Sequence, residues 1–272
     1  MTNRYELLAI RALVCALFTA TMACVVMAQS SPAAPGAMAL TPYTAPDKSV
    51  SAGVPSGWSV DKAEQTVIVM TGPHGERVLL GTTLIARNAP FQLAEAKSGA
   101  VDISMPYQAG LGQKLTMILQ RTAATTGQAA PQIAISSVTA IPLSTALGQC
   151  GRVVADYTGA HGPTKIVALL CSLPIDRAGM YKNMYKLAQA PMAVAQQSAP
   201  VAAAIFASYR IPIDMLRRKL APVTAPVMSV GPAPGDGGQA ALDAAECFDL
   251  TVLRETPRNQ LPKKCGGTAP DR

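Results

Sequence analysis

The sequence predicts an α+β fold, in which antiparallel hairpins alternate with amphipathic helices. Two hairpins are indicated, at residues 65–86 and 150–171, because β-branched apolar runs flank short Gly-containing turns. Two helices are indicated, at residues 107–122 and 199–209, where apolar residues recur with a helical period. The 272 residues suffice for one substantial domain, or for one domain with a smaller appendage.

The N-terminus has the features of a secretory signal peptide at residues 1–28. Arg4 and Arg11 supply the positive start, an apolar run follows, and Val26-Met27-Ala28 places small residues where a signal peptidase cleaves. The alternative is an anchor that is kept, although the apolar run is at the short limit for spanning a bilayer. We expect cleavage after Ala28, a periplasmic or secreted protein, and no stable membrane span once the signal is removed.

The charge of the chain does not favour nucleic acid as a partner. Removal of the signal takes away Arg4, Arg11 and Glu6, so 21 basic and 15 acidic residues leave a net charge of +6. The basic residues are dispersed, and aromatic residues make up only 4% of the chain, so bases would find few stacking platforms.

The first half of the mature chain is predicted to form strands around one helix. Residues 29–48, rich in Ser, Pro, Ala and Gly, are expected to be a flexible lead-in. A short strand and turn follow at residues 49–58, and strands at 65–71 and 77–86 form a hairpin through a five-residue turn.

The helix at residues 107–122 has one apolar face, formed by Leu111, Leu115, Ile118 and Leu119. Residues 88–101 are ambiguous and partly helical, and residues 122–130 are expected to be a loop. Imperfect alternation over residues 132–143 predicts a strand with a bulge.

The hairpin at residues 150–171 has a predicted register. Folding about Ala160 and His161 sets Cys150 opposite Cys171, and Asp156 opposite Lys165, a favourable pair of opposite charges. The same register gives an almost wholly apolar face, made of Val153, Ala155, Tyr157, Ile166, Ala168 and Leu170. A slip by one residue would exchange the two faces of the hairpin.

Four cysteines remain in the mature chain and predict two disulfides in an oxidising compartment. The hairpin geometry favours Cys150 with Cys171, so the second pair is Cys247 with Cys265 by elimination. A zinc site made of the four thiols is the alternative, but the short Cys-x-x-Cys spacing of such sites is missing.

The C-terminal part contains a helix and then a change of composition. The helix at residues 199–209 is expected to start at Pro200 and to stop before Pro212. Residues 221–238 are rich in Pro and Gly and predict a linker. The predicted organisation is therefore an α+β domain at residues 49–220, the linker, and a disulfide-stapled C-terminal tail at 239–272.

Two short motifs resemble those of a known family. With Val54-Pro55-Ser56-Gly57-Trp58 near its start and Ile205-Phe206-Ala207-Ser208-Tyr209-Arg210 near its end, the segment 49–211 resembles PsbP-like domains. The resemblance implies an antiparallel β-sheet sandwiched by helices, with Trp58 and Tyr209 at core positions. It also implies a protein that binds partners or assists assembly. The metal binding of the family does not carry over, because no His or carboxylate cluster stands at matching places.

Residues of catalytic type occur only in isolation. His74 and His161 lie in predicted turn tips, where a solvated side chain is far more common than a triad member. Ser59 and Lys62 match the Ser-x-x-Lys spacing of penicillin-recognising enzymes but lack the companion motifs, so the match is attributed to chance. The sequence thus predicts no catalytic residue.

Residues 180–192 contain the other candidate ligands. Met180, Met184 and Met192 suggest a copper site, but methionines at helical spacing usually fill a core. Tyr181 and Tyr185, interleaved with Lys182 and Lys186, suggest either a strip that faces a ligand or partner, or lysines whose stems cover a packed tyrosine pair. No metal or cofactor is predicted.

The expected function is that of an exported, non-enzymatic domain that binds an unknown protein or envelope component. The alternatives are a metal or small-ligand carrier of the periplasm and a hydrolase with an unrecognised site.

Overall fold

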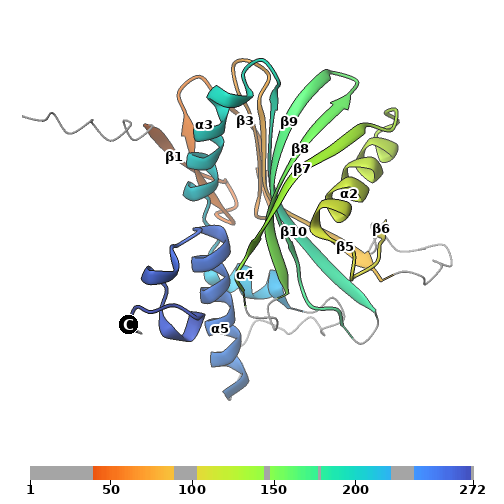
Figure 1. The fold of residues 1–272 in the computed structure, drawn as a ribbon. Helices are drawn as coiled ribbons and strands as arrows, with labels where there is room; N and C mark the ends of the chain where they lie inside the picture. The colour runs from red at the N-terminus through yellow and green to blue at the C-terminus, as the bar shows by residue number, and fades with distance from the viewer. Residues whose placement is uncertain (1–38, 89–102, 144–147, 177–178, 222–235, 271–272) are drawn as a thin grey trace, which may run out of the picture. The chain divides into compact units, whose positions relative to one another are not determined.

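The computed structural model describes residues 39–88, 103–143, 148–176, 179–221 and 236–270 (Figure 1). Its centre is an eight-stranded sheet in the order β3-β4-β5-β10-β9-β8-β7, with β6 pairing parallel to β5 and every other pair antiparallel. The strands of this sheet are β3 (Ser59–Glu64), β4 (Val67–Thr71), β5 (Arg77–Arg87), β6 (Ile103–Ser104), β7 (Gln132–Ile141), β8 (Gln149–Gly159), β9 (Gly162–Ser172) and β10 (Met180–Pro191).

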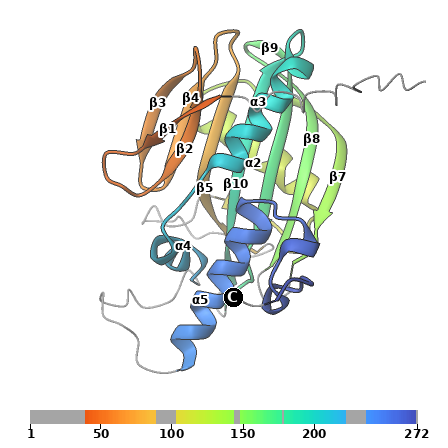
Figure 2. The same ribbon diagram turned by 90° about the vertical axis from the view of Figure 1, so that its left-hand side faces the viewer.

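Helices cover both faces of the sheet, as Figures 1 and 2 show. Helix α2 (Leu111–Thr125) contacts β7, β8 and β9 on one face. On the other face, α3 (Ala195–Ser208) contacts β10, and α4 (Ile213–Leu220) packs against α5 (Asp236–Phe248). The predicted fold class, an antiparallel sheet sandwiched by helices, is confirmed.

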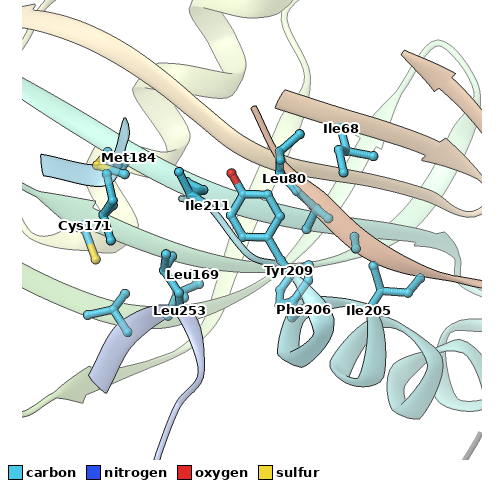
Figure 3. Close-up of a cluster of buried hydrophobic side chains, with 14 of the residues drawn as sticks. Ile68, Leu80, Leu169, Cys171, Met184, Ile205, Phe206, Tyr209, Ile211 and Leu253 are labelled. Carbon is cyan, nitrogen blue, oxygen red and sulfur yellow. The ribbon is translucent and has the colours of Figure 1, made fainter. Parts of the chain in front are cut away.

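Each face of the sheet has its own apolar core. Leu115 and Ile118 of α2 pack with Val153, Ala168 and other residues of the predicted hairpin face. On the opposite face, Ile205, Phe206 and Tyr209 at the end of α3 pack against the sheet (Figure 3). The Tyr209 hydroxyl donates to the Thr66 carbonyl oxygen at 2.6 Å, which satisfies a polar group inside this core. The core position predicted for Tyr209 is therefore correct, and Trp58 packs partly buried against the same core.

The hairpin register predicted from the cysteines is confirmed. Cys150 pairs with Cys171, and Gly159 with Gly162, so that β8 and β9 meet in a two-residue turn at Ala160 and His161. Lys165 forms the expected ion pair with Asp156. The Sγ atoms of Cys150 and Cys171 are 2.07 Å apart, at disulfide distance.

Other elements follow the predicted pattern. The strands β4 and β5 form the expected hairpin, the apolar face of α2 is buried at Leu115 and Ile118, and β7 has a register shift between Ile135 and Ser137 where a bulge was predicted. Residues 89–102, which include most of the ambiguous segment, lie outside the described residues.

The predicted lead-in is wrong for its last part, because Leu40–Thr44 forms β1. This strand pairs with β2 (Ser51–Pro55) in a separate two-stranded sheet. The Asp47 carboxylate accepts from the backbone N–H of Ser49 and of Gln65, at 3.0 and 2.8 Å, and so joins this hairpin to the β3–β4 turn. Order thus begins before Ser49.

The segment from Met180 is not helical but forms β10, a central strand between β5 and β9. Successive strand residues face opposite sides of the sheet. Tyr181 and Tyr185 therefore lie in the core beneath α2 (the α2-side core), while Met184 lies in the core beneath α3 (the α3-side core). The stems of the interleaved lysines do not cover the tyrosine pair, and Lys186 is itself buried. Both interpretations offered for this segment are wrong, because the two tyrosines are buried on the α2 side of the sheet while Lys186 lies on the other side.

The helices after β10 also differ from expectation. Helix α3 begins at Ala195, so Pro200 lies inside it rather than at its start. A short helix that the sequence did not indicate, α4, follows Pro212.

The C-terminal residues belong to the core rather than to a separate tail. Residues 222–235 of the predicted linker lie outside the described residues, and α5 already starts at Asp236. The helix continues into a π-helical turn, η2 (Asp249–Leu253), and two short 3-10 turns follow, η3 (Arg258–Gln260) and η4 (Lys263–Cys265). Phe248, Val252 and Leu253 join the α3-side core, and the Sγ atoms of Cys247 and Cys265 are 2.02 Å apart.

Candidate interaction surface

The residue types of a catalytic triad meet at the β4–β5 turn, but in the wrong order. Glu76 is buried, and its carboxylate accepts from the Ser198 hydroxyl at 2.9 Å and lies 3.3 Å from Nδ1 of His74. A triad needs the imidazole between the hydroxyl and the carboxylate, so that it can take the hydroxyl proton. Here the carboxylate stands between them, and the three residues tie the turn to α3.

The other candidate catalytic residues are not brought together. His161 lies at the tip of the β8–β9 hairpin. On β3, the Ser59 hydroxyl donates to Asp61 at 3.1 Å and Lys62 pairs with Glu64 at 2.9 Å, so each has another partner.

The methionines of residues 180–192 cannot share a metal ion. Met184 is buried in the α3-side core, whereas Met192 is exposed just beyond the end of β10. The eight residues from Met184 to Met192 span about 26 Å, and the four from Met180 to Met184 span about 13 Å, and both distances are too long for two ligands of one ion. Within the described residues, no group of three or more His, Cys, Asp or Glu side chains could hold a metal.

A second pair of catalytic type is sealed in the α2-side core. The Lys114 ammonium donates to the Ser172 hydroxyl at 2.9 Å, and that hydroxyl donates to Oδ1 of Asn183 at 2.7 Å. The ammonium also lies over the rings of Tyr107 and Tyr181, at 4.8 and 5.1 Å. Lys114, Ser172 and Asn183 have no exposed surface, so a substrate cannot reach this pair, and the cluster ties α2 to the sheet.

Lys186 likewise ties a helix to the sheet, on the opposite face. Its ammonium donates to the Phe206 and Leu253 carbonyl oxygens, at 3.2 and 3.0 Å, and so joins β10 to the end of α3 and to η2. A cavity of about 20 Å³ adjoins it, lined mainly by apolar residues such as Met184 and Phe248. This volume holds about one water molecule and excludes an organic ligand.

Burial lowers the pKa of both Lys114 and Lys186 to about 8. An unfolded chain keeps these lysines near pKa 10.4, so between about pH 8 and pH 10 it holds more protons than the folded chain. The free energy of unfolding should therefore rise with pH over this window, by about 1 kcal/mol per pH unit for each lysine. Urea unfolding at pH 7.5, 8.5 and 9.5 measures the slope.

The variant Lys186→Met provides the control for this slope. It removes one titrating group, so its unfolding free energy should rise less steeply with pH than that of the wild type, whatever its stability at pH 7.5. Parallel curves for the two proteins would show that Lys186 does not titrate in this window.

The two edge strands of the sheet differ in how they are protected. β3 carries Asp61, Lys62 and Glu64, and charged side chains hinder the addition of another strand. β7, at the other edge, has the sequence QIAISSVTAI, with neither a charge nor a proline. Figure 2 shows β3 and β7 at opposite margins of the sheet.

β7 is also accessible over most of its length. Within the described residues its one neighbouring strand is β8, so one row of backbone N–H and C=O groups has no strand partner there. Ile133 and Ile141 are half-buried and the other eight residues are exposed. Exposed, uncharged and long, this strand has the features of a template for strand addition on each side of the bulge at Ser136, which interrupts the row of backbone groups there.

An apolar pair lies on the α2 side of this edge. Ile135 pairs with Ala155 and Val138 with Val153, both in the α2-side core, so the bulge puts Ile135 and Val138 on the same face. Both side chains lie beside Gly112 at the start of α2, yet they are 38% and 49% exposed. We define the β7 edge as residues 132–141, which include this pair.

The sequence predicted this strand and its bulge but not its place in the sheet. The available signal was the absence of charge from residues 132–141, compared with three charges in residues 59–64. That contrast becomes informative only once the strand order shows that both segments are edges.

No helix in the described part of the chain is long and apolar enough to span a membrane. No family model and no curated protein sequence matches the chain.

Solved structures of similar fold are found at low sequence identity. The solution structure of cyanobacterial PsbP from Synechocystis sp. PCC 6803 is 12% identical, with 68% of this chain and 99% of that chain covered and a TM-score of 0.36. The Ran-binding protein Mog1p of Saccharomyces cerevisiae is 7% identical, with 64% and 96% covered and a TM-score of 0.33.

LpqN, described as involved in cell envelope biogenesis of Mycobacterium tuberculosis, is 13% identical, with 64% and 91% covered and a TM-score of 0.33. PsbP, the family that the two sequence motifs resemble, is thus among the structures that this chain is similar to. These similarities concern the fold alone.

Proposed function

We propose that this chain is an exported, non-enzymatic domain that binds a protein partner, and that the partner adds a strand to the β7 edge. The observation that supports this is the difference between the two margins of one sheet. β3 bears three charges, while β7 is uncharged, is exposed over most of its length and carries the exposed apolar pair Ile135 and Val138. Main-chain hydrogen bonds would give the affinity, and the apolar pair would select β-branched side chains in the partner.

The groups of catalytic type support a non-enzymatic role. Lys114, Lys186 and Ser172 are buried in contacts that join helices to the sheet, and the Ser198–Glu76–His74 contact has the carboxylate in the middle. Among the described residues, no observation favours the hydrolase or the metal or ligand carrier.

Export is part of the proposal and has a direct measurement. Intact mass spectrometry of the protein from its own cells should give a chain that starts at Gln29 and takes up no alkylating agent without reductant. Both cysteine pairs lie at disulfide distance, which supports the expected absence of free thiols. A chain that retains residues 1–28, or that alkylates at Cys150 or Cys171, would contradict export to an oxidising compartment.

Site-specific photo-crosslinking in the producing cells tests the binding surface. A photoreactive residue at position 138 should give a discrete protein adduct, because the Val138 side chain is 49% exposed near the centre of the β7 edge. The matched control is position 62 on β3, which is also exposed and lies on the opposite margin.

The proposal requires that the adduct from position 138 be absent from position 62. It must also be lost when Ile135 is replaced by Lys, which puts a charge on the edge. No adduct at position 138, or the same adducts from both positions, would overturn strand addition at β7.

A further inference from the structure

The exposed apolar residues of β7 lie symmetrically about the middle of the strand, and this symmetry points to a second copy of the same chain as the partner. We propose that β7 of one copy pairs antiparallel with β7 of a second copy, about a twofold axis between Ser136 and Ser137. This inference rests on the proposed function, because it supplies an occupant for the same edge. The register pairs residues whose numbers add up to 273.

This register uses the complete strand. The first residue, Gln132, pairs with the last, Ile141, and the runs 132–135 and 138–141 pair with each other, while the bulge at Ser136 interrupts the ladder at the axis. Any other antiparallel register leaves residues unpaired at one end of each strand. The symmetric register therefore pairs the most residues, and it brings the bulges of the two copies together at the axis.

The bulge is compatible with the same axis. Paired residues of adjacent strands must point to the same face of the sheet. Ser136 is the extra residue of the bulge, so Ile133, Ile135, Val138 and Ala140 all lie on the α2 side. The register pairs Ile135 with Val138 and Ile133 with Ala140, and so keeps like faces together on both sides of the axis. A register shifted by two residues would set Ile135 opposite Ser136 or Ala140 and leave the exposed pair unmatched.

The pairing covers the exposed apolar side chains. Ile135 of each copy contacts Val138 of the other copy, so the contact occurs twice, once on each side of the axis. Ile135 and Val138 are the two large aliphatic residues of the strand that are exposed in a single copy. Aliphatic β-branched pairs across adjacent strands are favourable. Removing them from water supplies a driving force that a single copy lacks.

Charges on the neighbouring strands do not oppose the contact. Asp156 of β8 pairs with Ala134, and Arg152 pairs with Thr139. In the proposed register, Ala134 of one copy pairs with Thr139 of the other. One row across the four strands therefore begins with Asp156 of one copy and ends with Arg152 of the other. These opposite charges are three strand spacings, about 14 Å, apart. No like charges face each other along the seam.

Sedimentation velocity on the chain purified from its producing cells tests this inference. The wild type should be a dimer that dissociates on dilution. Ile135→Lys and Val138→Glu should each weaken dimerisation, roughly tenfold or more, because a charge is set against an aliphatic side chain at two places. The double variant should restore dimerisation, since the introduced ammonium of each copy then faces the introduced carboxylate of the other.

Matched controls place the same charges elsewhere. Ile213→Lys and Met192→Glu change exposed apolar residues away from β7 and should leave the dimer unchanged. Hydrogen exchange gives a measurement without substitution, because the amides of β7 should be protected at high protein concentration and exchange faster after dilution.

A wild type that is monomeric at all accessible concentrations overturns the inference, as does a dimer that both single variants leave intact. A double variant that stays as weak as the single variants overturns the register. If the purified protein is monomeric while position 138 crosslinks to a different protein in cells, the dimer is refuted and the proposed function survives. If position 138 gives no adduct, both fail.

Discussion

A chain that ends at Ala221 is expected to lose cooperative folding, although composition alone marks the following residues as a linker and tail. Phe248, Val252 and Leu253 are almost fully buried against β9, β10 and α3. Burying each such side chain is worth about 1.5–3 kcal/mol, so their loss costs roughly 5–9 kcal/mol. That is comparable with the total stability of a typical domain, about 5–15 kcal/mol. Thermal unfolding followed by near-ultraviolet circular dichroism measures the loss.

Point variants of the complete chain separate packing from chain length. Phe248→Ala should destabilise by about 3–5 kcal/mol, since it leaves a cavity where the side chain had contacts on all sides. Lys263→Ala, at an exposed position of the same segment, should stay within about 0.5 kcal/mol of the wild type. A fragment ending at Ala221 with a sharp transition at the wild-type temperature would instead support an independent domain at residues 49–220.

The substitution Gly81→Ala is the second change with a large expected effect. Gly81 lies within β5 at φ +73°, and a Cβ there would stand 1.8 Å from the Tyr209 hydroxyl oxygen and 2.1 Å from the Thr66 carbonyl oxygen. Real Cβ atoms do not approach so closely, so the Tyr209–Thr66 hydrogen bond and the β3–β4 turn must both shift. We expect a loss of about 3 kcal/mol or more, from the buried hydrogen bond together with the strained backbone. Urea unfolding checks it.

Gly127→Ala is the matched control for backbone conformation. Its φ of +68° is nearly the same, but no atom lies within 4 Å of an added Cβ. It should therefore cost only about 1 kcal/mol, the strain of the left-handed conformation alone. Equal losses for the two variants would show that the contact with Tyr209 contributes nothing.

Local patterns in the sequence were sufficient for the hairpins and for α2. The β8–β9 register followed from two cysteines at equal distances from a turn, and the buried face of α2 followed from the spacing of Leu115 and Ile118. The β8–β9 register and the buried face of α2 both depend on residues that are close in sequence, so the spacing of apolar residues is enough to predict them.

The strands that were misjudged depend on distant residues. β10 is covered on both faces, so it lacks the alternation of a half-buried strand, and Met180 and Met184 happen to have a helical spacing. β3 is a charged edge strand with a bulge and has no apolar alternation to detect. Its neighbours in the sheet, rather than its own pattern, identify it as a strand.

The candidate surface was beyond prediction for the same reason. Whether β7 is an edge depends on the pairing of β5 with β10, which joins residues about a hundred positions apart and fixes the order of all the strands. The predicted tail was misjudged because Pro and Gly before it indicated separation, whereas the burial of Phe248 and Leu253 depends on α3 and β9.

The contribution of the last residues to the core has a consequence for how the chain is made. The α2-side core needs no residue beyond Leu187, so it can form while the ribosome is still adding the C-terminal part. The α3-side core must wait for Phe248, Val252 and Leu253. Until those residues emerge, apolar side chains on one face of the sheet remain uncovered, and we expect the nascent chain to bind chaperones that recognise such surfaces.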